Sequence, residues 1–479
     1  PGGVPPGGPA ARAASEIVAH EAITIDLLEG FPAENGVLSG DGSAEDPFVI
    51  ESIEIGSGEY GIADCISIRN VDAHVVIRDV YLHSGDRGIW MYNCSNISVL
   101  DSYIFSNYWS EVDIMFSDHI SFHNCTILAD TESQYPGFAV DRSSYLTITG
   151  STFGGKGITF EPEEGLYAPS PDVQFASHVI APDNLLDGKP ILYYSGQTDL
   201  EVDGATAGQV ILANCDSAAV TGLTMSGGDV AVFAVNSPGV RISNCTVSEV
   251  STGIRVHNSP GCTVSGNEVE EASDAGIWVS KGCNDSTVAD NYISFCGYGL
   301  RVEMCSSTVS GNEVHMGSWG ISVGFYVGPV IVRDNTVTGC LGGIMAVNFY
   351  LEPVAIEGNH VERCTRGIRV MLTSGAEVSD NNLTENDYGI MLETCANCSV
   401  HDNSLVDGEY GIYLTGCGGI EVFDNSIDDV DVETFDDNEG ENSWDTRGYT
   451  LEMVAVIVAV SLLIVVLLAA VLYRRRKAA

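Results

Sequence analysis

The sequence predicts an all-β protein, a single-stranded parallel β-helix with rungs of about 22 residues, followed by one C-terminal transmembrane helix. Two residue columns, one of glycine and one of asparagine, recur at nearly even spacing, and the residues between them alternate between apolar and polar. These repeats predict the coil, and a long uncharged stretch near the end of the chain predicts the helix.

The glycine column consists of a glycine followed by an apolar residue, repeated at steps of 21 to 24 residues. Its members are Gly253, Gly276, Gly299, Gly320, Gly343, Gly367, Gly389 and Gly411. The asparagines, each preceded by Gly or Asp, are Asn267, Asn291, Asn312, Asn335, Asn359, Asn381, Asn403 and Asn425. Alternation with period two is typical of strands. Strands this short become stable when rungs about 4.8 Å above and below pair with their backbones. Leucine-rich repeats share the period, but their leucine-rich consensus is missing, which favours a parallel β-helix.

The same rhythm continues more loosely towards the N-terminus, so we predict one continuous coil over residues 21–427, after a Pro/Gly-rich segment at 1–20. Earlier rungs are expected at Gly61, Gly88, Glu111 and Gly137. Residues 154–214 contain five prolines and break the rhythm, and we interpret them as an irregular excursion from the coil. The repeat ends after Asn425. We expect the acidic residues 428–450 to form a solvated stalk.

Met453–Tyr473 contains 21 residues without a charge, and about 20 apolar residues span a bilayer as a helix. The basic run Arg474–Lys477 follows at once, within a tail at 474–479. By the positive-inside rule this tail is cytoplasmic, which predicts a single-pass protein of the cell membrane with an extracellular coil. The chain starts at Pro1 without an apolar signal region, so we expect a signal peptide to be missing or already removed.

The charge balance argues against nucleic acid as a partner. Lys and Arg total 20 against 66 Asp and Glu, a formal net charge of -46. Phosphate backbones are bound by clustered cations, which this chain lacks. The acidity instead suits a hydrated surface, in high salt or near divalent cations.

Three stretches carry a family resemblance: "LSGDGSAEDPFVIESIEI" (Leu38–Ile55), "NLLDGKPILYYSGQTDLEVDGATAGQVILANC" (Asn184–Cys215) and the later repeats. They resemble the NosD-like right-handed parallel β-helix proteins, also described as carbohydrate-binding and sugar-hydrolysis repeats of the pectin-lyase-like superfamily. The resemblance covers roughly Leu38 to Ile427 and is closest to membrane-anchored surface members of prokaryotes, archaea in particular. It implies a right-handed coil, and leaves the function open because one fold hosts many functions.

The asparagine column has a structural explanation. Stacked amides can donate to the next rung, and the preceding Gly or Asp suits a left-handed backbone. Ser102, Cys125 and Cys245 are expected to fill the same column upstream. We therefore predict that these asparagines hold the stack together.

Fourteen cysteines invite a disulfide interpretation, although cysteines in ladder positions also behave as small buried apolar residues. Cys283 with Cys305, and Cys395 with Cys417, are the pairs on neighbouring rungs that a disulfide could join. The CxxC of Cys395–Cys398 is weak evidence for metal or redox chemistry. Glycosylation candidates are Asn93, Asn96, Asn284, Asn382 and Asn397, whereas Asn124 and Asn244 lie in the tight-turn column.

The candidate site lies on outward residues of the early rungs. Asp113 and Asp141 are the catalytic candidates, because they fall on adjacent rungs and glycoside hydrolysis uses two carboxylates about 5–9.5 Å apart. Glu303 and Glu393 lie four rungs apart, about 19 Å, which is too far. The ligand-binding candidates around the aspartates are Trp90, Tyr92, Trp109 and Arg142. Aromatic rings beside carboxylates and an arginine suit a sugar.

Three hypotheses follow. The first is a surface-anchored β-helix for glycan binding, adhesion or envelope structure, with envelope glycans or other surface proteins as partners. The second is a polysaccharide-active hydrolase or lyase, although the catalytic motifs of the superfamily's polygalacturonases are missing. The third is a copper accessory protein, for which His119 and His123 are the one close histidine pair. No metal-ligand set stands out, and we expect no cofactor, with a bound Ca²⁺ left open.

Overall fold

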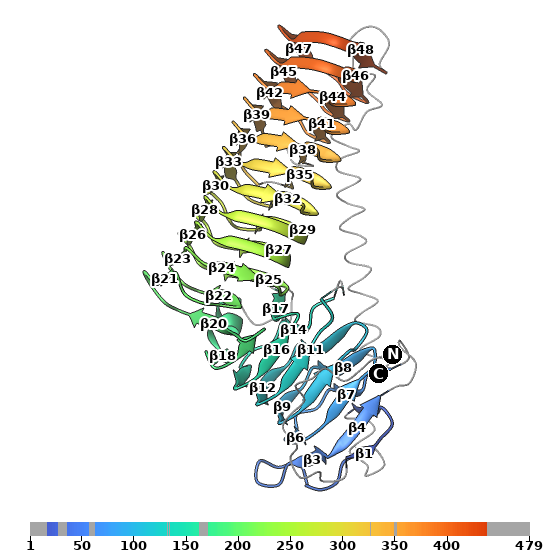
Figure 1. Cartoon of the computed structure of the whole chain (residues 1–479), viewed down its shortest axis with the longest axis vertical. Coiled ribbons are helices and arrows are strands. Elements are labelled where there is room, and N and C mark those ends of the chain that lie inside the picture. Colours follow the sequence, from blue (N-terminus) through green and yellow to red (C-terminus); the bar gives the residue numbers. More distant parts are fainter. Residues whose placement is uncertain are drawn as a thin grey trace, which may run out of the picture.

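The computed structural model describes residues 17–26, 36–56, 63–131, 133, 135–161, 171–325, 327–348 and 352–437. These residues form a right-handed parallel β-solenoid of about 16 turns, as the repeats predicted. Figure 1 shows two coils of stacked short strands, the lower one tilted against the upper one. The predicted membrane helix Met453–Tyr473 and the tail lie outside the described residues. Within the described ranges, no helix is long and apolar enough to span a bilayer.

The N-terminal coil has three parallel sheets, named first, second and third in the order in which the chain visits them on each rung. The first contains β2 (Ile23–Asp26), β5 (Ile66–Arg69), β8 (Arg87–Tyr92), β11 (Ser110–Met115), β14 (Phe138–Asp141) and β17 (Ile158–Glu161). The second contains β3 (Phe48–Glu51), β6 (Val75–Arg78), β9 (Ser95–Leu100), β12 (Asp118–His123), β15 (Thr147–Thr149) and β18 (Val179–Ile180). The third contains β1 (Val18–Ala19), β4 (Ile53–Gly56), β7 (Tyr81–His83), β10 (Tyr103–Phe105), β13 (Thr126–Leu128), β16 (Thr152–Gly154) and β19 (Leu185–Leu186).

The C-terminal coil repeats this arrangement. Its first sheet contains β20 (Lys189–Ser195), β22 (Gln209–Ala213), β25 (Val230–Val235), β27 (Thr246–His257), β29 (Glu268–Ser280), β32 (Tyr298–Glu303), β35 (Trp319–Gly324), β38 (Gly342–Val347), β41 (Arg366–Met371), β44 (Tyr388–Glu393), β46 (Ser404–Thr415) and β48 (Ser426–Asp436). The second contains β21 (Glu201–Asp203), β23 (Ala219–Thr221), β26 (Arg241–Ser243), β28 (Thr263–Ser265), β30 (Ser286–Ala289), β33 (Ser307–Ser310), β36 (Val330–Arg333), β39 (Val354–Glu357), β42 (Glu377–Ser379), β45 (Ser399–His401) and β47 (Glu421–Phe423). The third contains β24 (Thr224–Ser226), β31 (Tyr292–Ser294), β34 (Glu313–His315), β37 (Thr336–Thr338), β40 (His360–Glu362) and β43 (Asn382–Thr384), and the long strands β27, β29, β46 and β48 turn the corner from the third sheet into the first.

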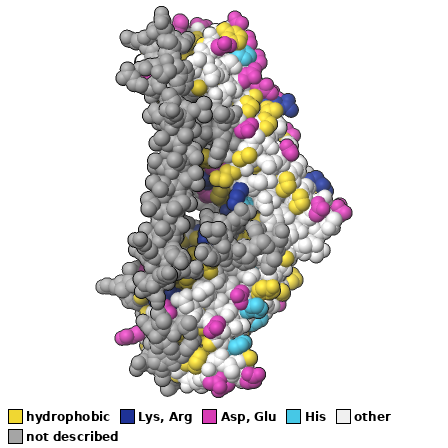
Figure 2. All heavy atoms as spheres, turned by 180° about the vertical axis from the view of Figure 1, so that it is seen from behind, with side chains coloured by type: hydrophobic (Ala, Val, Ile, Leu, Met, Phe, Trp, Pro, Cys, Tyr) yellow, Lys and Arg dark blue, Asp and Glu magenta, His cyan; other side chains and the backbone are white. Residues whose placement is uncertain are grey.

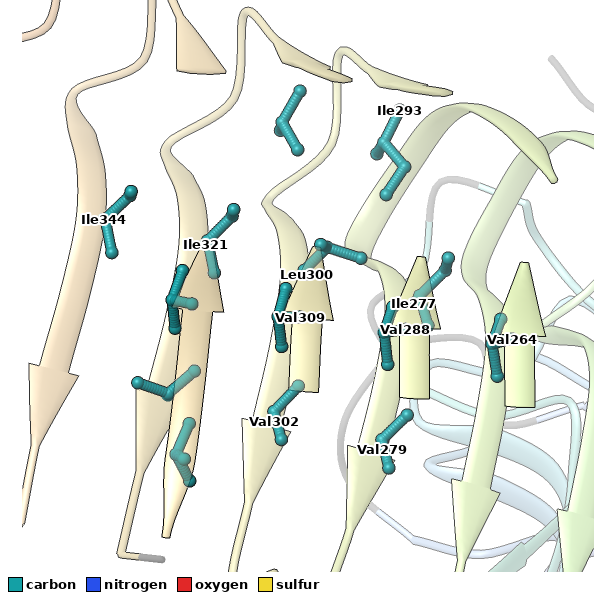
Figure 3. Close-up of a cluster of buried hydrophobic side chains, with 14 of the residues drawn as sticks. Val264, Ile277, Val279, Val288, Ile293, Leu300, Val302, Val309, Ile321 and Ile344 are labelled. Carbon is teal, nitrogen blue, oxygen red and sulfur yellow. The ribbon is translucent and has the colours of Figure 1, made fainter. Parts of the chain in front are cut away.

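Inward side chains form continuous apolar stacks. In Figure 3, Val264, Val288 and Val309 lie side by side on neighbouring strands of the second sheet, across from Ile277 and Leu300 of the first. All five side chains are fully buried. Burying each such side chain contributes about 1.5–3 kcal/mol relative to leaving it exposed, so the coil depends on this core.

The interior contains two hydrophobic cores where the sequence interpretation expected one continuous coil. The N-terminal core ends against the outward side chains of β22 and β25, including Ile211 and Phe233. Helix α1 (Pro171–Ala176) contributes Phe175, whose ring meets Phe233 edge-on. The residues expected to form an excursion therefore contain regular strands that close one coil and start the next. Their prolines and reversed pairing (β19 runs antiparallel to β20) hid this from the repeat analysis.

Buried polar groups join the two coils. Asp229, just before β25, forms an ion pair with Lys156 at 3.0 Å, and both side chains are 6% exposed. Asp229 also accepts hydrogen bonds from the Thr159 hydroxyl at 3.1 Å and the Gly137 amide at 3.3 Å. The Gln209 side chain bonds both the amide and the carbonyl of Ile158. These groups fix the end of the first coil to the start of the second.

The predicted asparagine ladder is present. Each side-chain oxygen accepts from the backbone amide of the asparagine one rung earlier, at 2.9–3.1 Å from Asn267 to Asn425. Each Nδ2 donates onwards to the next Oδ1 at 2.9 Å. The preceding residues, such as Gly266 and Asp290, have φ near +60°, as predicted.

The glycine column is required by close packing between rungs. A Cβ built at Gly299 would lie 2.5 Å from the carbonyl oxygen of Gly320 on the next rung. Glu111 takes the glycine position in one early rung, and its carboxyl is buried against Asn107. Of the expected early rungs, Gly61 lies outside the described residues.

The coil continues past the boundary predicted at Ile427. β48 pairs with β46 over its length, so the first residues of the expected acidic stalk form a strand. Tyr413 and Phe435 stack at 4.6 Å across these strands, and this apolar contact favours pairing although the strand is acidic. At the other end Val18 already pairs with Ile53, inside the segment 1–20 that was expected to precede the coil.

Candidate functional site

The outward face of the N-terminal coil's first sheet carries two columns of side chains. In register order the first column is Thr24, Ser67, Trp90, Asp113, Ala139 and Thr159. The second is Asp26, Arg69, Tyr92, Met115, Asp141 and Glu161. The alternation within each strand turns these residues outward while their neighbours fill the core. The structure thus brings four sequence-predicted residues, Trp90, Tyr92, Asp113 and Asp141, onto one surface.

Asp113 and Asp141 lie on adjacent rungs but do not face each other. Asp113 is in register with Ala139, and Asp141 with Met115, so the two aspartates are diagonal neighbours, whose Cα atoms lie about 7–8 Å apart. Each has an arginine of its own. Nε of Arg87 lies 3.0 Å from Asp113 Oδ2, and Nε of Arg142 lies 3.3 Å from Asp141 Oδ1.

Arg87 is the centre of the cluster, and the sequence reasoning missed it. Its Nη1 lies 3.2 Å from Asp64, and its guanidinium lies over the rings of Trp90 at 5.0 Å and Trp109 at 4.8 Å. Burial raises the pKa values of both Asp64 and Asp113, and Arg87 opposes this shift. Asp64 lies in the turn before β5. The alternation of apolar and polar residues, which identifies outward side chains in strands, does not extend into this turn.

The aromatic side chains form two contacts that include turn residues. Trp109 stacks on Tyr135 with ring centroids 6.0 Å apart, and the two side chains are 40% and 38% exposed. Tyr92 meets Phe116 edge-on at 5.4 Å, with the Arg142 guanidinium over Phe116 at 5.0 Å. Tyr135 and Phe116 were missed by the sequence reasoning because they lie in turns, outside the alternation.

Two buried donors in this surface lack an acceptor. Nε1 of Trp90 and Nε of Arg69 make no hydrogen bond, although Arg69 Nε lies 3.7 Å from Asp26 as an ion pair. The Arg69 guanidinium also lies 5.7 Å from the Trp90 ring. A buried donor without an acceptor costs about 1–3 kcal/mol, so an acceptor supplied by a ligand would be favourable here.

Glu161 and Arg255 extend the surface across the junction. Glu161 is directly opposite Asp141 on the next rung, and its Oε2 lies 3.4 Å from Nη2 of Arg255 on β27. The sequence reasoning missed Glu161 because it falls in the expected excursion, 94 residues before its partner. The later carboxylates are paired as well, Glu303 with Arg301 at 3.0 Å and Glu393 with Arg369 at 2.7 Å.

The cysteines are buried in the inner columns, and no disulfide joins any two of the fourteen. Cys283 and Cys305, and Cys395 and Cys417, the pairs that a disulfide could have joined, are therefore free thiols. Cys417 instead accepts a hydrogen bond from the Cys395 amide at 3.4 Å. Burial raises the pKa of Cys305 to about 12, as expected for a small apolar residue of a core.

The two histidines of the predicted pair have separate partners. His119 bonds Asp118 at 2.6 Å and stacks on Tyr145, whereas His123 bonds the Thr149 hydroxyl at 2.7 Å. Across the residues that the structure describes, no group of three or more His, Cys, Asp or Glu side chains is placed to hold a metal ion.

The glycosylation candidates Asn93, Asn284, Asn382 and Asn397 are exposed and Asn96 is half-buried, so their modification stays a prediction. Figure 2 shows acidic side chains spread over the visible described surface, with few basic ones.

Comparisons with known proteins agree with the coil. The family model described as right handed beta helix region matches residues 36–173. Similar solved structures include the mannuronan C-5 epimerase AlgE6 A-module of Azotobacter vinelandii, at 11% identity over 81% of this chain and 91% of that chain, with a TM-score of 0.29. The Siphovirus 9NA tailspike receptor binding domain is 11% identical over 89% of this chain and 78% of its own, with a TM-score of 0.36. The family 28 exopolygalacturonase of Yersinia enterocolitica is 9% identical over 88% and 79%, with a TM-score of 0.27. Likenesses this distant say nothing of this chain's ligand.

No curated protein matches the chain. The family model described as periplasmic copper-binding protein (NosD) matches residues 187–326 and again 326–443, which together exceed half of the sequence. The second match begins where the first ends, as expected for a coil of repeated rungs. The chain belongs to the NosD family of right-handed parallel β-helix proteins.

Proposed function

We propose that this protein binds a glycan on the outward face of its N-terminal coil, and that it does so at the cell surface. The observation that carries the proposal is the exposed Trp109–Tyr135 stack beside Arg87 and Trp90. Tryptophan and tyrosine combine an apolar ring with a polar N–H or O–H group. They are therefore suited to ligands that have both apolar and polar surfaces. A sugar ring is such a ligand, because it presents C–H groups on its faces and hydroxyls around its rim.

The polar groups around the stack match the rim of a sugar. The Trp90 indole N–H and Arg69 Nε are donors without acceptors, and Asp113 offers carboxylate oxygens beside Arg87. Asp64 and Asp113 hold Arg87 between two carboxylates, which fixes the guanidinium before a ligand arrives. Such preorganisation lowers the entropy cost of binding.

The surface location rests on the sequence. Met453–Tyr473 has the length and composition of a single span, and the basic run after it favours a cytoplasmic tail. Protease treatment of intact cells tests this arrangement. Digestion of the coil in intact cells supports it, and protection until the cells are lysed contradicts it.

Glycan-array binding of the full chain, compared with Trp109→Ala and Tyr292→Ala, tests the binding site. Tyr292 is a matched control on the C-terminal coil. Its side chain is 39% exposed and contacts another ring, that of His315. We expect Trp109→Ala to lose the glycan signal of the wild type. Tyr292→Ala should keep that signal. Silence of the wild-type chain on arrays and on envelope polysaccharides would remove the proposal.

A second candidate function is cleavage of a polysaccharide. The observation that favours it is that Asp141 lies in direct register with Glu161 on the neighbouring rung. Glycosidases use such a pair of carboxylates. Reducing-end and unsaturated-product assays on acidic glycans test it. Activity that survives Asp113→Ala, Asp141→Ala and Glu161→Ala would exclude this surface as the active site.

Copper, which the family description names, has no place in this proposal. His119 and His123 are each bonded to other residues. Within the described ranges, the residues present do not fit a copper site.

A further inference from the structure

A second cluster of arginine and tryptophan lies on the C-terminal coil. Arg255, Trp278 and Arg301 occupy one register column on β27, β29 and β32. The guanidinium of Arg255 lies 4.5 Å from the centroid of the Trp278 ring, and that of Arg301 lies 4.4 Å from it. The ring is thus held between cations from the rungs on either side.

The Trp278 ring cannot bind a ligand in the way proposed for the exposed Trp109–Tyr135 stack. Both neighbouring rungs place a cation against the Trp278 ring, so the ring is not available as a platform for a sugar face. The ring separates the two guanidinium groups and holds them in place. Cation–π contacts of this kind are strongest when they are shielded from water. A ligand would therefore bind the N–H groups of the two guanidinium groups and of the indole.

Two of those N–H groups lack an acceptor. Arg255 is 8% exposed, and its Nε makes no hydrogen bond. The indole Nε1 of Trp278 is buried and makes none either. Each costs about 1–3 kcal/mol as an unsatisfied donor, and an acceptor supplied by a ligand would remove this cost.

The carboxylates nearby occupy other atoms of the arginines. Glu161 contacts Nη2 of Arg255 at 3.4 Å, and Glu303 contacts Nε of Arg301 at 3.0 Å. A guanidinium carries five N–H donors in a planar fork that matches carboxylate and sulfate oxygens. Donors therefore remain after these two contacts, and the Arg255 Nε and Trp278 Nε1 groups are the buried ones that lack an acceptor.

We propose that Arg255, Trp278 and Arg301 form a binding site for an oxyanion carried by an acidic sugar, a carboxylate or a sulfate ester. The site lies on the C-terminal coil and stands whether or not the Trp109–Tyr135 stack binds a glycan. The acidic surface elsewhere does not prevent binding, because salt screens charges beyond about 8 Å at physiological ionic strength. A ligand placed on the column lies closer than this to both guanidinium groups and to their partners Glu161 and Glu303, so the unpaired N–H donors rather than a net positive charge would hold the anion.

Isothermal titration calorimetry of the full chain at physiological ionic strength tests the site. The probes are trigalacturonate for a carboxylate, sucrose octasulfate for a sulfate and maltotriose as the neutral control. The variants are Arg255→Gln, Arg301→Gln and Trp278→Leu, with thermal unfolding measured for each. Arg333→Gln is the matched control, because Arg333 lies on β36 of the second sheet and has an exposed ion pair with Asp334 at 3.7 Å.

We expect one anionic probe to bind, and Arg255→Gln and Arg301→Gln each to weaken it roughly tenfold or more, while Arg333→Gln and Trp109→Ala leave it unchanged. The probe that binds identifies the anion as carboxylate or sulfate. The proposal is overturned if neither anionic probe binds, if folded Arg255→Gln and Arg301→Gln keep the wild-type affinity, or if Arg333→Gln weakens binding equally. Loss of array signal in Trp109→Ala with unchanged calorimetry separates the two sites.

Discussion

Replacing Asn335 by alanine removes a side chain that links three rungs of the asparagine ladder. Its Oδ1 accepts from the amide and from Nδ2 of Asn312, at 3.0 and 2.9 Å. Its Nδ2 donates to the carbonyl of Val309 at 3.0 Å and to Oδ1 of Asn359 at 2.9 Å. Asn335 is 1% exposed and Asn312 is fully buried, so water cannot take over these bonds without a local opening.

The loss can be estimated group by group. The Asn312 amide is left without an acceptor, which costs about 1–3 kcal/mol. The Asn312 Nδ2 keeps Val288 and Ser310 as acceptors, so its loss is smaller. Lost hydrogen bonds of about 1 kcal/mol each, and the space left by the amide, bring the total to roughly 3–5 kcal/mol.

Urea unfolding followed by far-UV circular dichroism measures this change, and an unchanged slope would show that the unfolded state is unaffected. Asn425→Ala is the control, because Asn425 makes the same bonds to Asn403 at the open end of the ladder, where water is close. We expect it to cost about 1 kcal/mol. Equal losses for the two variants, or a loss below about 1 kcal/mol for Asn335→Ala, would refute the assignment of the ladder as a buried hydrogen-bond chain.

Three further predictions follow from buried groups. Burial raises the pKa of Glu111 to about 8, above its unfolded value, so its contribution to stability is complete at acidic pH and is lost as pH rises through about 8. The wild-type free energy of unfolding should therefore fall by roughly 3–5 kcal/mol more than that of Glu111→Gln between about pH 5 and 9, and parallel curves would contradict this. Gly299→Ala places a Cβ 2.5 Å from the Gly320 carbonyl oxygen, and we expect at least about 2 kcal/mol of destabilisation by urea unfolding, whereas a Cβ at Gly324 would meet its nearest atom at 3.8 Å, so Gly324→Ala should cost less. Asp229→Ala leaves Lys156 as an unpaired buried cation, so we expect a loss of about 3–5 kcal/mol, and a melting temperature equal to that of the wild type would show that the junction does not depend on this pair.

The periodic part of the fold was predictable because every rung repeats the same physical requirements. The glycine column marks where a carbonyl of the next rung lies too close for a side chain, and the asparagine column marks the buried amide chain. The outward positions of Trp90 and Asp113 follow from the same alternation. Register within a coil is thus encoded locally, by residues about 22 positions apart.

The rest depends on contacts that periodicity does not encode. The division into two cores required Ile211 and Phe233 to face outward against another coil, although they read as ordinary strand residues. The pairing of Asp113 with Arg87 and of Glu161 with Arg255 depends on turn geometry and on the angle between the coils. A sequence pattern places such side chains on a surface but does not choose their partners.

The asparagine ladder also has a direction. From Asn267 to Asn403 each backbone amide and one N–H of each Nδ2 donate to the next asparagine towards the C-terminal end, while Nδ2 also donates to a carbonyl of the rung before it. Aligned hydrogen-bonded dipoles polarise one another, so the row has a positive end at Asn425, much as a helix has one at its N-terminus. The acids of β48, among them Asp428 and Asp429, follow directly in the chain. Carboxylates near the positive end of a dipole row are attracted to it, so the ladder favours acidic residues directly after Asn425.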